Sequence, residues 1–145
     1  MMAMSTMAVA CSDNNGTSPG PQVFKATLNG ANERPTPVSS TAAGNATVTL
    51  SASGDTLSWT VTITAAIDSI TLGHIHHGVA DSAGPVRVNF NPPPTGAGFT
   101  GIATQGTTVL TGDSVQTWIR TGAAYVNIHT KAHPGGEIRG QLVKQ

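Results

Sequence analysis

A strict alternation of apolar and polar residues over residues 57–65 is the feature that most constrains how this chain can fold. Every second residue in the segment is apolar, and the residues between them are serine or threonine. This period of two places all the apolar side chains on one face of an extended strand. A strand with one apolar and one polar face is typical of an antiparallel sheet that covers a core with one side. The apolar residues are Leu57, Trp59, Val61, Ile63 and Ala65.

Shorter alternating segments, separated by residues that favour turns, run along most of the chain. We expect strands over residues 23–28, 46–50, 57–65, 68–76, 86–90, 99–103, 107–110, 124–130 and 137–143. Residues 113–122 break the pattern, because Val115, Trp118 and Ile119 follow the spacing of a helix. The predicted fold class is therefore all-β, an antiparallel Greek-key sandwich or flattened barrel with one short helix at one end.

The composition predicts one domain and excludes several classes of partner. The chain has 145 residues, of which 10% are charged, and its formal net charge is zero. No basic surface is available to bind nucleic acid or an anionic membrane. The sequence also has no Walker phosphate-binding loop and no Ser-His-Asp arrangement that would indicate a hydrolase. We therefore predict no catalytic residues and leave enzymatic activity open.

The N-terminal residues 1–21 differ in character from the rest of the chain. A short apolar run ends in small residues at Cys11, the single cysteine, and a polar linker rich in turn residues follows. The pattern resembles the end of a bacterial lipoprotein signal peptide, whose cysteine becomes diacylated. The resemblance implies an exported protein, anchored through Cys11 in the periplasm, on the outer membrane or at the cell surface. The alternative is an N-terminal segment with an incidental thiol, and in both cases residues 22–145 form the domain.

All five histidines fall into two clusters, one at His74, His76 and His77 and the other at His129 and His133. His74 and His76 are two residues apart on an expected strand, so their side chains share a face about 6.5–7 Å apart. His129 lies on another expected strand, in phase with its more polar residues. Three neutral imidazoles from two strands suit copper or zinc. We therefore predict that the two clusters meet at a metal ion.

The strand of the first cluster contains a conflict of phase. Strict alternation places His74 and His76 on the same face as Leu72, which is the apparent core side. Glycine within a strand often marks a β-bulge, where one extra residue exchanges the two faces. We predict such a bulge at Gly73. It would bury Ile75 in the core and turn both histidines toward the surface.

Five further side chains are candidates for supporting roles. His133 could be a fourth ligand, could hydrogen-bond to a ligand, or could simply be exposed. The same alternatives apply to His77, which we rank below His133 as a candidate ligand. Glu33 lies between turn signals and could orient a histidine by a hydrogen bond. Glu137 and Arg139 alternate on one strand face. They could support the site in the same way, or form a structural ion pair or hydrogen bonds to loop backbone.

Four stretches of the sequence together carry a resemblance to a family. Residues 24–35, 73–78, 125–130 and 134–142 look like a CHRD domain, the module named from the animal protein chordin and widespread in bacteria. The resemblance implies an all-β sandwich of the immunoglobulin-like or superoxide-dismutase-like kind. The step from His74 to His76 is also similar to the copper-ligand strand of the Cu/Zn superoxide dismutases. His129 belongs to the CHRD motif itself.

The residues and the resemblance together favour an exported, lipid-anchored copper-binding protein. His74, His76 and His129 would be ligands, with His133 or water completing the set. We expect copper before zinc, because copper stands higher in the affinity order for nitrogen ligands. The role would be to bind, buffer or deliver copper in the cell envelope, with a protein as the partner in delivery. The alternatives are a metal-independent adhesion or interaction module and a copper-dependent redox enzyme such as a superoxide dismutase.

Overall fold

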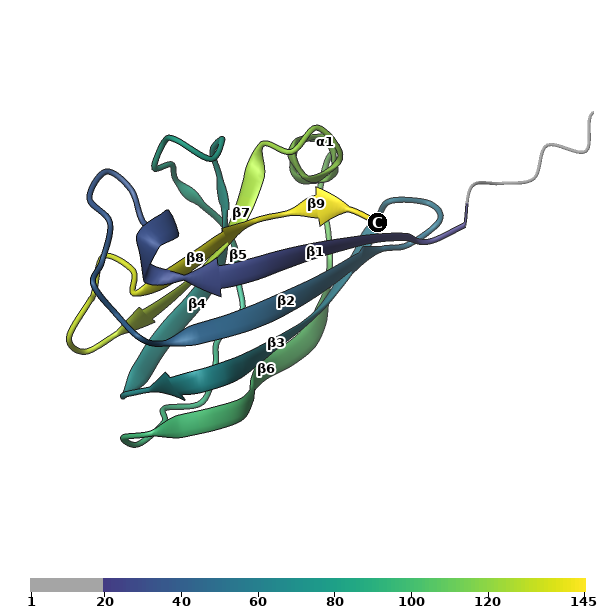
Figure 1. The fold of residues 1–145 in the computed structure, drawn as a ribbon. Coiled ribbons are helices and arrows are strands. Elements are labelled where there is room, and N and C mark those ends of the chain that lie inside the picture. Colours follow the sequence, from purple (N-terminus) through teal and green to yellow (C-terminus); the bar gives the residue numbers. More distant parts are fainter. Residues whose placement is uncertain (1–19) are drawn as a thin grey trace, which may run out of the picture.

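Our computed structural model describes residues 20–145, which contain nine strands, one α-helix and one turn of 3-10 helix (Figure 1). The predicted signal segment and its Cys11 lie outside the described residues. Of the predicted linker, only Gly20 and Pro21 are described. In chain order the elements are β1 (Gln22–Asn29), η1 (Gly30–Asn32), β2 (Ala43–Leu50), β3 (Thr56–Ile67), β4 (Ile70–His77), β5 (Val86–Asn89), β6 (Phe99–Val109), α1 (Ser114–Arg120), β7 (Ala124–Thr130), β8 (Ile138–Gln141) and β9 (Val143–Lys144).

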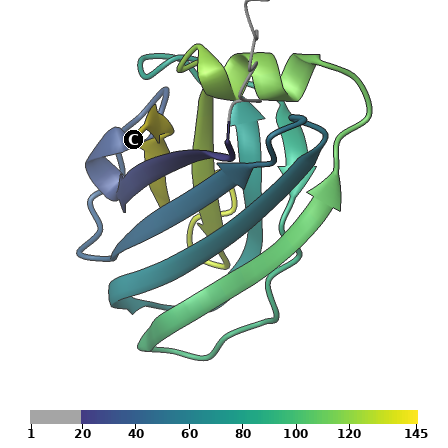
Figure 2. The same ribbon diagram turned by 90° about the vertical axis from the view of Figure 1, so that its right-hand side faces the viewer.

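The strands form one strongly curled antiparallel sheet with the order β5-β4-β7-β8-β1-β2-β3-β6, and β9 adds a third pairing to β1, which also pairs with β2 and β8. Because the sheet curls, β1, β2, β3 and β6 form one layer and β5, β4, β7 and β8 form the other (Figures 1 and 2). The two layers enclose the apolar core between them. This arrangement confirms the predicted all-β antiparallel sandwich with one short helix.

The alternation that predicted β3 also identifies most of the residues that this strand buries in the core. Leu57, Trp59, Val61 and Ile63 are buried, as expected. Ala65 is only half-buried, because the pairing of β3 with β6 changes register between Ile63 and Ile67. Ile67 takes the next core position instead of Ala65.

The structure differs from the expected strands at two places in the second half of the chain. The segments 99–103 and 107–110 form one strand, β6, because the 12-residue strand β3 offers pairing partners to the polar residues between them. The segment 137–143 is instead divided into β8 and β9. Leu142 separates them because its side chain is buried and its N–H donates to the carbonyl of Ala124.

Helix α1 covers one end of the sandwich, as Figure 2 shows. Ile119 inserts from the helix into the core, where it is 1% exposed. Trp118, on the same helix, packs against the core from a half-buried position. No helix among residues 20–145 has the length and apolarity needed to cross a membrane.

The predicted β-bulge is present in β4, but it precedes Gly73. The pairing of β4 with β7 shifts between Ile70 and Leu72. Ile70 is therefore buried, whereas Leu72 is 47% exposed and Ile75 returns to the core at 1% exposure. Gly73 has a different role: a Cβ atom there would lie 3.0 Å from the Cδ1 of Ile128 inside the core. The bulge produces the predicted exchange of faces, one step earlier than predicted.

Strand β4 places Ile75 in the core and Leu72 on the opposite face, so truncating each side chain to alanine should have very different effects on stability. We expect Ile75→Ala to lower the free energy of unfolding by about 2–5 kcal/mol, since it opens a cavity in the core. The control Leu72→Ala removes a half-exposed side chain from the opposite face and should cost less than about 1 kcal/mol. Denaturant unfolding of both variants measures the difference, and equal losses would contradict the assigned phase.

Candidate metal centre

Strands β4, β7 and β8 carry polar side chains on the face that points away from the core. The register pairs His74 with Asn127 and His76 with Tyr125, and it pairs Asn127 in turn with Arg139 on β8. These side chains do not reach the surface, because the loops that follow η1, β4 and β7 cover them. His74, His76 and His129 are only 6%, 7% and 6% exposed. The predicted surface location of the histidines was therefore wrong, although the predicted face was correct.

The structure brings together the three histidines predicted as ligands. One ring nitrogen from each of His74, His76 and His129 lies within 4.8 Å of the other two, in a group that could hold a metal ion. The Nδ1 of His74 and the Nε2 of His129 are 3.0 Å apart. The Nε2 of His76 is buried and has no hydrogen-bond partner. Buried polar atoms are almost always paired, so this unpaired nitrogen is a candidate ligand atom.

Backbone carbonyls determine which ring nitrogens are free to bind a metal. His76 donates from Nδ1 to the carbonyl of Gly84 at 2.8 Å, and His129 donates from Nδ1 to the carbonyl of Pro134 at 3.0 Å. Because a carbonyl only accepts, each Nδ1 carries a proton and each Nε2 presents a lone pair. His74 then donates from Nδ1 to the Nε2 of His129 in the metal-free protein. A metal would replace this shared proton.

Burial keeps the three imidazoles neutral, which is the form that binds metals. Desolvation lowers the pKa of His74 to about 4, with smaller contributions from the two neighbouring histidines. Desolvation also lowers the pKa of His76 and of His129, partly offset in each case by the hydrogen bond to a carbonyl. The residues present therefore fit a metal ion held by three neutral nitrogen ligands.

The comparison with protein families agrees with these residues. The CHRD domain family matches residues 24–142, a span that includes all three histidines of the group. The chain belongs to the CHRD domain family. No curated protein and no solved structure gives a significant match.

Arg139 anchors the loop that covers His76 in this CHRD domain. Its guanidinium is buried, at 2% exposure, and donates to the carbonyls of Val79 at 2.8 Å and Ser82 at 2.9 Å. The same loop provides the carbonyl of Gly84 that accepts from His76. Of the alternatives predicted for Arg139, hydrogen bonding to loop backbone is thus the one observed. Arg139 therefore supports His76 indirectly, through the loop.

Tyr125 contacts the site but was not among the residues predicted from the sequence. Its ring stacks on His76 with centroids 4.9 Å apart, and the guanidinium carbon of Arg139 lies 3.5 Å from the Tyr125 ring centroid. The Tyr125 hydroxyl accepts a 3.0 Å hydrogen bond from the N–H of Gly84. Tyr125 therefore fixes both the plane of the His76 ring and the loop above it. Its occurrence as the single tyrosine, two residues before Asn127, was the available signal.

Glu33 contacts Asn127 rather than a histidine, so its predicted role of orienting a histidine was wrong. The Nδ2 of Asn127 donates to Glu33 Oε2 at 3.3 Å, while Glu33 Oε1 and Asn127 Oδ1 are buried without partners. Burial raises the pKa of Glu33 to about 7, against the opposing effects of Asn127 and Arg139. Gly136 allows this contact: its φ is +127°, and a Cβ atom there would lie 2.5 Å from the Asn127 amide.

The remaining candidates lie around the site and are not part of the ligand group. Glu137 accepts hydrogen bonds from the hydroxyls of Ser40 at 2.7 Å and Thr130 at 2.6 Å, and so fixes the turn after β7. His133 belongs to that turn, where its carbonyl accepts from the Gly136 N–H, and its ring is not in the group of three. His77 stacks on Trp118 with ring centroids 4.1 Å apart.

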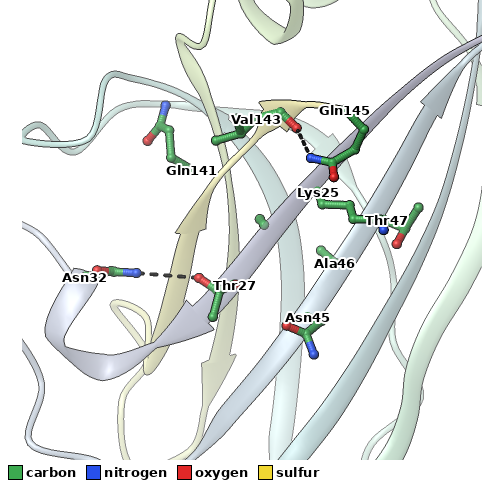
Figure 3. Close-up of a pocket in the computed structure, with 10 residues that line it drawn as sticks. Lys25, Thr27, Asn32, Asn45, Ala46, Thr47, Gln141, Val143 and Gln145 are labelled. Carbon is green, nitrogen blue, oxygen red and sulfur yellow. Dashed lines mark hydrogen bonds between the residues drawn. The ribbon is translucent and has the colours of Figure 1, made fainter.

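A wide groove of about 750 Å³ lies away from the histidines, on the outer side of β1, β2 and β9 (Figure 3). Its lining is mostly neutral and polar, and some of these side chains bond to nearby backbone. Asn32 donates to the carbonyl of Thr27, and Gln145 donates to that of Val143 (Figure 3). The groove contains no histidine, and the buried unpaired nitrogen of His76 lies elsewhere, so we assign the site to the histidines.

The raised pKa of Glu33 predicts a pH-dependent effect of its replacement. A carboxyl group whose pKa is higher in the folded than in the unfolded state loses stabilisation as the pH rises from about 4.5 to 7. Glutamine mimics the protonated acid and has no such loss. We expect Glu33→Gln to gain about 3 kcal/mol relative to wild type between pH 4.5 and pH 8.

Urea unfolding of both proteins across this range measures the gain. The histidines titrate in both proteins, so their contribution cancels in the difference. A difference that stays constant with pH would show that Glu33 is not buried as an acid.

Proposed function

We propose that this CHRD domain binds a copper ion through His74, His76 and His129, and that it binds, buffers or delivers copper in the cell envelope. The observation that carries the proposal is the group of three ring nitrogens within 4.8 Å of one another. The Nε2 of His76 strengthens it, because this buried atom has no partner in the protein. Leaving a buried nitrogen unpaired costs about 1–3 kcal/mol, a cost that a bound metal would remove.

The arrangement also supports exchangeable rather than permanent metal binding. Structural zinc sites generally have four protein ligands, whereas sites that exchange a ligand keep one position open. Among residues 20–145, only the three histidines belong to the group, and neither His133 nor a carboxylate joins them. A metal here would therefore keep a position for an incoming ligand, as delivery to a partner protein requires.

Copper is the preferred metal on chemical grounds. The ligand group consists of imidazoles alone, and copper forms stronger complexes than zinc with nitrogen ligands of this kind. The metal would supply a positively charged centre that accepts lone pairs. The protein would supply neutral ligands, whose ring orientations are held by the carbonyls of Gly84 and Pro134.

Copper titration of the metal-free protein tests the proposal. We expect one equivalent to bind, and we expect the variant with alanine at positions 74, 76 and 129 to lose at least about 100-fold in affinity. Isothermal titration in the presence of a competing chelator measures both. A parallel zinc titration decides between the two metals.

His77→Ala and His133→Ala are the matched controls, since each removes an imidazole that lies outside the group. Both should bind copper within about threefold of wild type. If wild type binds no tighter than the triple variant, the metal proposal fails. A metal-independent interaction module then becomes the better interpretation of the fold.

The proposed location rests on the sequence of the N-terminal segment alone. When the full chain is expressed in a bacterium, we expect it to fractionate with membranes and to incorporate a labelled fatty acid. Cys11→Ser should abolish the label and release the protein into the soluble fraction. Incorporation that persists in the Cys11→Ser variant would exclude lipidation at this cysteine.

A further inference from the structure

We infer that the histidine site selects monovalent copper, Cu(I), over divalent ions, and that the buried charge of Arg139 is the determinant of this selectivity. The inference rests on the proposed copper function, since it specifies which form of the metal the same site takes. It assigns Arg139 an electrostatic role in addition to its hydrogen bonds to the covering loop.

The first argument is the charge of the ligands. The group contains three histidines and no carboxylate or thiolate, so the ligands bring no negative charge to the metal. The ligands are also buried, at 6–7% exposure. Moving an ion from water into a low-dielectric site costs energy that rises with the square of its charge, so a divalent ion costs about four times as much as a monovalent one. Neutral, buried ligands therefore disfavour the divalent ion.

The second argument is the position of Arg139. Strand β7 lies between β4 and β8, and its Asn127 pairs with His74 on one side and with Arg139 on the other. The Tyr125 ring contacts both His76, at 4.9 Å between centroids, and the Arg139 guanidinium, at 3.5 Å. The positive charge is thus one aromatic ring away from a metal ligand, a separation over which a unit charge acts strongly in a buried setting.

The third argument is that no carboxylate pairs with this guanidinium. Its hydrogen bonds go to the carbonyls of Val79, Ala80 and Ser82. Within residues 20–145, the one ion pair joins Arg34 and Asp81, at 3.7 Å. Burial lowers the pKa of Arg139, but arginine keeps its charge in proteins. Asp81 acts on the guanidinium only from an exposed side chain that pairs with Arg34. A buried cation with no carboxylate in contact therefore lies beside the site.

Glu33 is the buried carboxyl group best placed to offset this charge, because it contacts Asn127. Around it lie Arg139 from β8 and Arg34 from its own loop, both of which favour its ionised form. Burial nevertheless dominates and raises the pKa of Glu33 to about 7, so the group is largely neutral at pH 6. At pH 6 the site therefore has the positive charge of Arg139 nearby, and Glu33 offers little negative charge to balance a second charge on the metal.

The test compares the affinities of the intact domain for Cu(I), Cu(II) and Zn(II) at pH 6. A chromophoric Cu(I) chelator under anaerobic, reducing conditions measures the first, and competing chelators measure the other two. Wild type should bind Cu(I) more tightly than both Cu(II) and Zn(II). Arg139→Gln removes the charge but keeps an amide that can donate to the loop carbonyls, and it should shift the preference toward both divalent ions by about tenfold or more.

Two further variants separate charge from packing. Arg139→Lys keeps the charge, so its ratio of Cu(I) to divalent affinity should stay within about threefold of wild type. Repeating the measurements at pH 8, where Glu33 is largely ionised, adds a negative charge near Arg139 without a substitution. The wild-type preference should shift toward the divalent ions between pH 6 and pH 8, whereas Glu33→Gln should not shift, and this comparison keeps the test decisive if Arg139→Gln does not fold.

The outcomes distinguish this inference from the proposed function. If copper binds no better than to the variant with alanine at positions 74, 76 and 129, the copper function itself fails. If copper binds through these histidines but Cu(II) binds more tightly than Cu(I), the selectivity is wrong while the copper function stands. The selectivity is equally wrong if the charge-changing variants fold and leave the affinity ratios unchanged.

Discussion

The histidine site depends on one buried guanidinium. Arg139 satisfies the carbonyls of Val79, Ala80 and Ser82, and these hydrogen bonds hold the loop after β4 against the sheet. The same loop carries Gly84, whose carbonyl places the proton of His76 on Nδ1. Without Arg139, the loop carbonyls would be buried without a donor, which costs about 1–3 kcal/mol for each group. The orientation of the His76 ring and the stability of the loop therefore have a common origin.

The CHRD fold has two interiors that differ in chemistry. One is the apolar core between the two layers of the curled sheet. The other lies on the outer face of β4, β7 and β8, where loops bury a layer of polar side chains. A buried polar layer is tolerated when its members are paired, and most of these are. The few unpaired atoms include the Nε2 of His76, the Oε1 of Glu33 and the Oδ1 of Asn127, so the polar interior concentrates its unsatisfied groups around the histidines.

Prediction from the sequence succeeded where a local pattern determines the result. The alternation in residues 57–65 predicted β3 and its core face, since a period of two has one structural interpretation. The phase conflict around His74 and His76 predicted a bulge and the burial of Ile75. The position of the bulge was wrong by a step because it depends on how β4 meets β7, where the register shifts between Ile70 and Leu72. A single strand does not contain that information.

The sequence by itself determined most of the strands, the face on which His74, His76 and His129 lie and the fact that these three meet, because periodicity and residue type act locally. Only the tertiary structure decided that these histidines are buried, since their cover comes from loops, some of them distant in sequence. It also decided the roles of Tyr125, Asn127 and Arg139, which come together through the register of β4, β7 and β8. The electrostatic environment of the site was likewise decided only by the tertiary structure. The effect of a charge depends on its distance from the site and on the burial of both, and neither can be read from the order of residues along the chain.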